Sequence, residues 1–450
     1  MQFANTLRMA PLVACLAAAL GLPSPSAHAA IRNVISCADD LSVGTLRQVV
    51  SVAVDGDIVD MSGLTCGTIT LMHGEIPIAV NNLDFQGPGG PNLGPGDVSL
   101  DHLLLTVTVP SGASSRIFHH TGTGRLHLNG FRVAGGHYAP VSGDAKGGCI
   151  NSAGNVRVVG VVVSNCAAAA PSGFIAVGGG IFSSGYTNVT ASRVSGNSAI
   201  TPDGYATGGG VATNGFSAYA STISGNSAVG QNAAAVAICG GINATGNVTV
   251  TQTTIDSNQA LNVGGLCERS TGTTAKFVNS TISGNTASGN IGAVSSAAPI
   301  QIYNSTFAFN SGNDKAAVFS NANAMVVSSI IAKNTTTLGG FTDLYVNGAG
   351  HTLSGSNNLI ISSNLGLPDT IRADPQLTPL AVHGDFLNVG LRTHAPLATS
   401  VVVDNGRNPL SLTTDERGTG YAREVPAGAP DIGAYERQVN DDEIFYSGFD

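Results

Sequence analysis

The hexapeptide Ser221-Thr222-Ile223-Ser224-Gly225-Asn226 decides the fold, because the chain repeats it with small changes along much of its length. Close copies are Ser192-Arg193-Val194-Ser195-Gly196-Asn197 and Ser280-Thr281-Ile282-Ser283-Gly284-Asn285, and looser copies end at Asn165, Asn258, Asn310 and Asn334. The steps between these Asn residues are 32, 29, 32, 27, 25 and 24 residues. Repeats of this length are typical of a solenoid, in which each unit buries its apolar face against its neighbours.

A second motif, Gly-Gly followed by an aliphatic residue, precedes most copies. It occurs as Gly179-Gly180-Ile181, Gly209-Gly210-Val211, Gly240-Gly241-Ile242 and Gly264-Gly265-Leu266. Between the motifs lie short strands such as residues 247–251, whose alternation predicts one buried and one exposed face. We therefore predict an all-β fold, a right-handed single-stranded parallel β-helix with a small C-terminal accessory domain. The hand follows the general rule for parallel crossovers.

Stacking of the repeats makes specific predictions about three residue types. One aliphatic or aromatic position should form an inward ladder, made of Val194, Ile223, Ile255, Ile282, Phe307 and Ile331. The recurrent Asn should close each strand and hydrogen-bond to its copies in neighbouring coils. The Gly-Gly pair should permit positive φ and a close approach between coils.

Composition excludes several classes of protein. Of the 450 residues only 10% are charged, with a net charge of −9, which excludes a basic nucleic-acid-binding surface. Hydrophobic residues make up 42%, too many for a disordered chain. No segment of the mature chain is long and apolar enough to span a membrane. We expect a monomer.

The N-terminus reads as a cleaved signal peptide, residues 1–29. Arg8 is its only charged residue, an apolar run covers residues 12–22, and Ala27-His28-Ala29 fits a signal-peptidase site. Residues 12–15 also fit a lipoprotein box, but the apolar run continues past Cys15. The sequence thus predicts a secreted or cell-surface protein.

Six cysteines remain after cleavage: Cys37, Cys66, Cys149, Cys166, Cys239 and Cys267. An even number in an exported chain indicates disulfides, with 15 formal connectivities. Neighbouring cysteines are 29, 17 and 28 residues apart, close to one repeat, which favours sequential pairing.

The repeats resemble those of polymorphic outer membrane proteins, whose paired motifs are G-G-A-[ILV] and F-x-x-N. Here Gly209-Gly210-Val211 and Phe307-Ala308-Phe309-Asn310 look like degenerate copies of these motifs. Gly44-Thr45-Leu46-Arg47-Gln48 is similar to the opening of exported β-helix proteins, which implies a short capping helix over the first coil.

The C-terminal part resembles the choice-of-anchor Q domain of bacterial surface proteins. The resembling stretches include Arg392-Thr393-His394, Thr414-Asp415-Glu416-Arg417-Gly418 and Asp431-Ile432-Gly433-Ala434-Tyr435-Glu436. The chain then divides into a signal peptide (1–29), an N-terminal cap with the first coils (30–100), the parallel β-helix (101–365), the choice-of-anchor Q-like region (366–436) and an acidic, aromatic tail (437–450). The resemblance implies an adhesin-like or structural surface protein that binds glycans or a surface partner.

Two groups of residues are candidates for the binding role. Outward strand positions are occupied by Thr222, Thr254 and Thr281, which form a neutral row that could bind sugars. Binding of ice or a mineral by this row is a less favoured alternative. Histidines also gather in the first coils, and His127 and His137 are the candidates among them, beside His102, His119 and His120. Their spacings match no metal-ligand pattern, so we predict no metal site.

An extracellular polysaccharide lyase or glycoside hydrolase is the alternative. A hydrolase needs two carboxylates, and a lyase needs a base near the uronate α-carbon with a cation or Ca²⁺ beside the uronate carboxylate. Charges are sparse on the coils, so the candidates are Asp256, Glu268, Arg193 and Arg269. No cofactor is expected, except that a lyase could use Ca²⁺.

Overall fold

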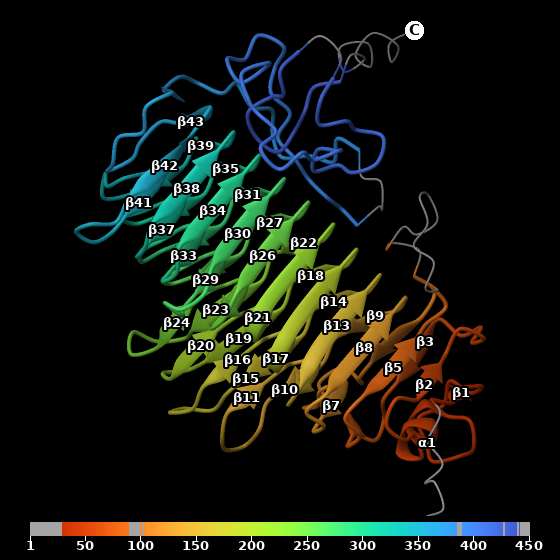
Figure 1. The fold of residues 1–450 in the computed structure, drawn as a ribbon. Helices are drawn as coiled ribbons and strands as arrows, with labels where there is room; N and C mark the ends of the chain where they lie inside the picture. Colours follow the sequence, from red (N-terminus) through yellow and green to blue (C-terminus); the bar gives the residue numbers. More distant parts are fainter. Residues whose placement is uncertain are drawn as a thin grey trace, which may run out of the picture.

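The computed structural model describes residues 29–89, 100, 103–384, 389–425, 428–438 and 441, and it is a parallel β-helix (Figure 1). Every pairing between its named strands is parallel, and successive coils stack in sequence order. The predicted fold class is confirmed. The signal peptide up to residue 28 and nearly all of the tail lie outside the described residues.

Four sheets run along the stack. Sheet 1 contains β1 (Ile31–Asn33), β2 (Ile58–Asp60), β4 (Ile76–Ile78), β5 (Leu83–Gln86), β7 (Phe118–His120), β8 (Arg125–Asn129), β12 (Ile150–Ser152), β13 (Asn155–Val159), β17 (Ile181–Thr190), β21 (Val211–Tyr219), β25 (Ile242–Ala244), β26 (Val248–Thr251), β29 (Leu266–Glu268), β30 (Ala275–Val278), β33 (Val294–Ser296), β34 (Ile300–Tyr303), β37 (Val318–Ser320), β38 (Ala324–Val327), β41 (Leu344–Val346) and β42 (Leu353–Ser356).

Sheet 2 contains β3 (Thr68–Thr70), β6 (Thr106–Thr108), β9 (Arg132–Ala134), β14 (Val162–Ser164), β18 (Arg193–Ser195), β22 (Thr222–Ser224), β27 (Thr254–Asp256), β31 (Thr281–Ser283), β35 (Thr306–Ala308), β39 (Ile330–Ala332), β43 (Asn358–Ile360) and β44 (Thr370–Ile371). Sheet 3 contains β10 (His137–Tyr138), β15 (Ala167–Ala169), β19 (Ser198–Thr201), β23 (Ser227–Gly230), β28 (Gln259–Ala260), β32 (Thr286–Ala287), β36 (Ser311–Gly312) and β40 (Thr335–Thr336). Sheet 4 is short, with β11 (Ala145–Lys146), β16 (Ala176–Val177), β20 (Tyr205–Thr207) and β24 (Val236–Ile238).

The inward ladder of sheet 2 has the predicted register. Val194, Ile223, Ile255, Ile282, Phe307 and Ile331 are successive Cα partners, and all six are fully buried. Each of these side chains therefore packs on its copies in the coils before and after it.

The predicted Asn ladder is present and continuous from Asn197 to Asn334. Each Asn donates from Nδ2 to Oδ1 of the Asn in the next coil, at 2.9 to 3.0 Å, and each Oδ1 also accepts the backbone N–H of the Asn before it. The last amide, Asn334, donates to Oδ1 of Asp343 at 2.8 Å. Burial raises the pKa of Asp343 to about 6.

In the first copy of the motif, which ends at Asn165, the ladder position lies one residue later than predicted. Cys166, not Asn165, occupies the ladder position, because its N–H donates to Oδ1 of Asn197. Asn165 instead has φ of 55°, the left-handed position that Gly196 fills in the next coil. Asn is one of the few residues that tolerates this conformation, which explains the mistaken alignment.

A second buried ladder explains the Ser that opens the motif. The hydroxyl of Ser221 accepts the backbone N–H of Ser192, its equivalent one coil earlier. The hydroxyls that accept in the same way in the following coils are those of Thr253, Ser280, Ser305 and Ser329. Each hydroxyl also donates to the carbonyl oxygen two residues before it. The recurrent Ser or Thr at the start of each motif is the sequence signal for this ladder.

The Gly-Gly pairs bring neighbouring coils close together, as predicted. A Cβ on Gly209 or Gly210 would lie 2.2 to 3.1 Å from backbone and Asn226 atoms in neighbouring turns. The positive φ lies one residue earlier, at Gly208 and its equivalents. That part of the prediction was wrong, because the turn is made before the pair.

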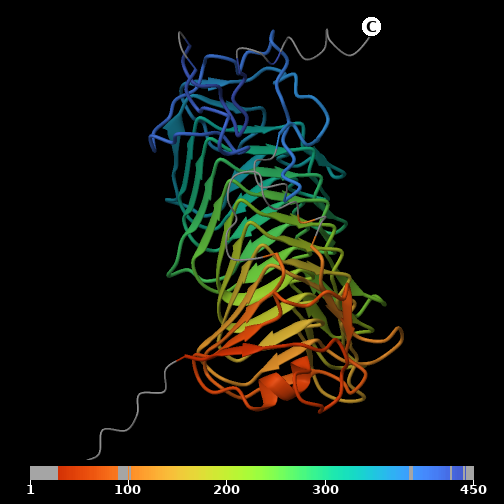
Figure 2. The same ribbon diagram turned by 90° about the vertical axis from the view of Figure 1, so that its right-hand side faces the viewer.

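The predicted capping helix is present as α1 (Leu46–Ser51), which lies across the first coil (Figure 2). Thr45 caps its N-terminus by accepting the N–H of Gln48. Leu46, Val49 and Val50 are buried against the coil end, so the helix covers apolar surface that no further coil would cover.

All three disulfides pair sequential cysteines, Cys37–Cys66, Cys149–Cys166 and Cys239–Cys267. The predicted pairing is confirmed. Disulfides form and persist in oxidising compartments, which indicates an extracellular protein. Within the described ranges, no helix is long and apolar enough to cross a membrane.

After β44 the chain leaves the coils and turns back along sheet 2, beside β43, β39, β35 and β31 (Figure 1). We call its described residues from 372 onward the C-terminal segment. Val402 and Ile432 of this segment pack with Ile330, Ala332 and Leu359 of sheet 2 in one apolar cluster. The segment therefore covers one side of the solenoid.

Candidate functional site

The Thr row does not form an open binding face. Thr222, Thr254 and Thr281 are at most 2% exposed, because the C-terminal segment lies over them. Thr254 and Thr281 both donate from Oγ1 to the carboxyl group of Glu416. The prediction of an accessible neutral row was wrong, since Thr254 and Thr281 bind Glu416 and the hydroxyl of Thr222 is buried without a hydrogen-bond partner.

The motifs that suggested a choice-of-anchor Q domain hold this segment in place. Arg417 donates from Nε to Oδ2 of Asp415 at 2.9 Å, and its guanidinium lies 3.7 Å from the ring centre of Tyr435. Arg423 Nη1 lies 3.6 Å from Oε2 of Glu436. Burial, together with the nearby Asp431, raises the pKa of Glu436 to about 8. We assign this buried cluster to docking, not to contact with a ligand.

The four residues considered for polysaccharide cleavage do not come together. Asp256 lies on sheet 2, fully buried and paired with Arg392 of the C-terminal segment. Glu268 ends β29 of sheet 1 and accepts the N–H groups of Ser270 and Ala298, so it closes a turn.

The two arginines are also engaged elsewhere. Arg193 lies two coils before Asp256 and donates to the carbonyl of Val389, while Arg269 bonds the hydroxyl of Tyr205. No carboxylate pair with a nearby cation therefore results from Asp256, Glu268, Arg193 and Arg269.

The early basic residues are largely matched by carboxylates in adjacent coils. Glu75 accepts from Arg116 at 2.7 Å and contacts Nδ1 of His119 at 2.8 Å. His127 lies on sheet 1 with its Nδ1 3.4 Å from Asp84, whereas the exposed His137 lies on sheet 3. The two predicted binding histidines are thus on different sheets. His102 lies outside the described residues, and no group of three potential metal ligands is found in the described chain.

A change in coil size creates a hollow on the solenoid. The coil from Asn226 to Asn258 has 32 residues and includes β24 of sheet 4. The next coil, from Asn258 to Asn285, has 27 residues, and sheet 4 ends with β24. The larger coil therefore projects past the smaller one and leaves a step.

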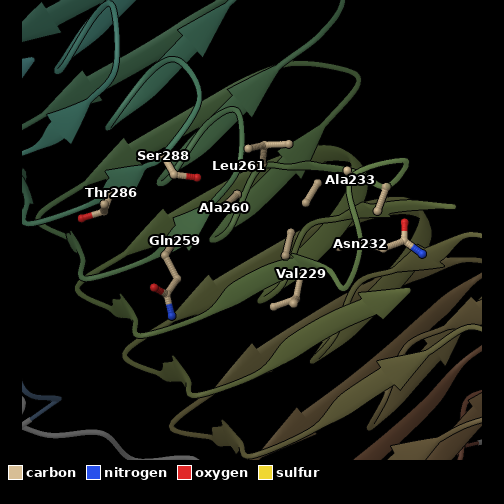
Figure 3. Close-up of a pocket in the computed structure, with 12 residues that line it drawn as sticks. Val229, Asn232, Ala233, Gln259, Ala260, Leu261, Thr286 and Ser288 are labelled. Atoms are coloured by element: carbon tan, nitrogen blue, oxygen red, sulfur yellow. The ribbon is translucent and has the colours of Figure 1, made fainter. Parts of the chain in front are cut away.

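The groove at this step has a volume of about 550 Å³ (Figure 3). Its wall comes from residues 228–237 of the larger coil, and its floor from Gln259, Ala260, Leu261, Thr286 and Ser288 of the next two coils. The 12 described lining residues carry no charge. Val229 and Leu261, 37% and 42% exposed, supply apolar surface, and Asn232 and Gln259 supply amide donors and acceptors. We call this feature the step groove.

A small aromatic surface lies on sheet 1. Phe319 and Tyr345 are partners on adjacent strands, with ring centres 5.8 Å apart and planes inclined by 6°. Phe341 lies 5.3 Å from Tyr345 and is 40% exposed. Lys315 Nζ lies 5.6 Å from the ring centre of Phe319 and 5.0 Å from that of Tyr345. The exposed ring of Phe341 is the part of this surface that can stack on the apolar face of a sugar.

No family model and no curated protein matches the chain. The resemblances to polymorphic outer membrane proteins and to the choice-of-anchor Q domain therefore stay predictions. Among solved structures, the chain is similar to the crystal structure of pectate lyase Pel9A, with a TM-score of 0.45 and 13% identity over 91% of this chain and 96% of that one. A likeness of this degree carries no argument about activity, and the fold assignment rests on the strand pairings.

Proposed function

We propose that this is an extracellular, adhesin-like β-helix protein that binds an uncharged glycan in the step groove. The observation that carries the proposal is the absence of charge among the described residues of a groove that still offers amides, hydroxyls and exposed aliphatic carbon. Neutral sugars present the same mixture of hydroxyl groups and apolar ring faces. The aromatic surface on sheet 1 supplies a second area suited to sugar contact.

Binding suits this geometry better than cleavage. Glycoside hydrolysis needs two carboxyl groups on either side of the scissile bond, and a lyase needs a base with a cation beside it. The described residues that line the step groove include neither. Attachment to the cell surface is part of the same proposal and rests on the resemblance of the C-terminal region.

The test is binding of residues 30–450 to a panel of neutral and acidic polysaccharides, measured by calorimetry at low and high salt. We expect a neutral glycan to bind with an affinity that changes little with salt, because no exposed charge of the groove would be screened. Gln259→Ala and Leu261→Arg should each weaken binding at least tenfold. Gln301→Ala, an amide on β34 of sheet 1, is the matched control and should not.

The same samples distinguish binding from cleavage. Unsaturated uronic ends absorb in the ultraviolet, and hydrolysis releases new reducing ends. We expect neither signal to rise. Cleavage activity, or binding that survives both groove substitutions, would contradict the proposal.

A further inference from the structure

A second pocket, of about 550 Å³, lies between sheet 2 and the C-terminal segment, apart from the step groove. Its apolar side consists of Phe309, Leu377, Pro379 and Leu380. Phe309 is 42% exposed and the Arg392 side chain 35%, so the pocket opens to solvent at these residues, whereas Ser283 and His394 are only 2% and 3% exposed. Its polar residues are Ser257, Ser283, Arg392 and His394.

Ser283 and His394 are in direct contact in this pocket. The Oγ of Ser283 lies 2.8 Å from Nε2 of His394. On the other side of the ring, Nδ1 lies 2.8 Å from the carbonyl oxygen of Thr378. A carbonyl oxygen can only accept, so Nδ1 carries the proton and donates it. Nε2 is then the acceptor, and the Ser283 hydroxyl donates to it.

This is the arrangement of an activated serine, in which a histidine accepts the hydroxyl proton and a third group orients the ring. The position of the imidazole is fixed further by Phe309, whose ring centre lies 4.8 Å from that of His394. Burial lowers the pKa of His394 to about 4, which keeps the ring neutral and its Nε2 lone pair available at neutral pH.

Arg392 places a cation beside this pair. It is held by Asp256, which is the Cα partner of Ser283 on the adjacent strand. Adjacent strands are about 4.8 Å apart, so the ion pair lies one coil from the serine. The other carboxylate oxygen of Asp256, Oδ1, is buried and has no hydrogen-bond partner. The pocket therefore combines a nucleophile, a base, a guanidinium and an apolar wall.

We propose that Ser283 and His394 form an acyl-transfer site that hydrolyses carboxylic esters of small apolar acyl groups. The Ser283 Oγ attacks the ester carbonyl carbon while its proton moves to Nε2 of His394. The alcohol leaves with that proton, and the acyl group stays on Ser283. Water then attacks the acyl-enzyme, His394 takes the proton of the water and returns it to Ser283, and the carboxylic acid departs.

The surrounding residues fit the charge and shape of this reaction. The guanidinium of Arg392 lines the pocket and would stabilise the negative charge that develops on the carbonyl oxygen. Leu377, Pro379 and Leu380 provide a wall for the acyl group. A histidine of low pKa is a weak base, so we expect slow turnover, and the test therefore measures covalent capture.

The experiment treats the full mature chain with a fluorophosphonate probe, which phosphonylates activated serines, and maps the label by mass spectrometry. We expect near-stoichiometric label on Ser283. Labelling should fall at least tenfold in Ser283→Ala and in His394→Asn. Ser224→Ala is the control, because Ser224 holds the same row position two coils earlier and should leave labelling unchanged.

The mapping on the unmodified chain keeps the proposal testable even if a variant folds poorly. No label on Ser283 in the folded wild-type chain would overturn the proposal, because a serine that only docks the C-terminal segment is not activated. Equal labelling in His394→Asn, with an unchanged circular dichroism spectrum, would also overturn it. A p-nitrophenyl acetate burst that disappears in Ser283→Ala would confirm the acyl-enzyme step.

Discussion

Truncation of one amide in the Asn ladder should destabilise the solenoid far more than truncation of an exposed amide. Asn285 is fully buried, and its Nδ2 donates to the carbonyl of Ile255 at 2.9 Å and to Oδ1 of Asn310 at 3.0 Å. Its Oδ1 accepts both the backbone N–H and the side-chain amide of Asn258, at 3.1 and 2.9 Å. The substitution Asn285→Ala removes all of these contacts together.

The expected loss follows from the groups left without partners. The backbone N–H of Asn258 and one hydrogen of its Nδ2 lose their acceptor, while the other Nδ2 hydrogen still bonds the carbonyl of Ile223. Each unsatisfied buried group costs about 1–3 kcal/mol. We therefore expect Asn285→Ala to lower the free energy of unfolding by about 4 kcal/mol. Asn247→Ala removes an exposed amide that accepts the N–H of Thr274 at 2.9 Å, and it should cost less than about 1 kcal/mol.

Guanidinium chloride unfolding, followed by far-ultraviolet circular dichroism, measures both losses. Hydrogen exchange should also increase first in the coils around Asn285, because within the stack each coil pairs only with its two neighbours. A loss for Asn285→Ala no larger than that for Asn247→Ala would refute the reasoning. The ladder would then satisfy its own groups without stabilising the fold.

Three further predictions concern other buried contacts. Burial raises the pKa of Asp343 to about 6. The stability that protonated Asp343 contributes is therefore largest below the ordinary pKa of an aspartate and falls as pH rises through 6. Thermal melts from pH 4 to 7 should show the wild type losing up to about 3 kcal/mol relative to Asp343→Asn. Burial likewise raises the pKa of Glu416, so Glu416→Gln should change the melting temperature little at pH 7. Thr281→Val should instead cost about 1–3 kcal/mol, because it leaves a buried carboxyl oxygen of Glu416 without its donor. Replacement of both Cys149 and Cys166 by Ser should cost about 3 kcal/mol in chemical denaturation, and an unchanged midpoint would contradict the assignment of that disulfide.

The repeat pattern was sufficient to predict the fold, because the physical requirements of stacking are local and periodic. Each Ile or Val of the inward ladder must pack on its own copy, so a fixed spacing in sequence becomes a row in space. The error at Asn165 has the same origin. A left-handed turn position and a ladder position can both be filled by Asn, and only the contact to Asn197 distinguishes them.

The surroundings of the candidate sites could not be predicted in the same way. The Thr row looked open because nothing local in the sequence brings Glu416 back over Thr254 and Thr281. The contact between Ser283 and His394 likewise joins residues 111 positions apart. A usable signal for the step groove was present, however, in the shortening of the repeat from 32 to 27 residues.

The step groove also shows how such a chain could gain or lose binding sites over evolutionary time. Within the stack a coil pairs only with the coils on either side, so a deletion of a few residues in one loop moves one wall and leaves the inward ladder intact. Recessed surfaces could arise wherever two successive coils differ in length, with little disturbance to the rest of the stack. A solenoid of this kind can diversify its ligands through insertions and deletions, whereas most globular domains must replace side chains around a pocket that already exists.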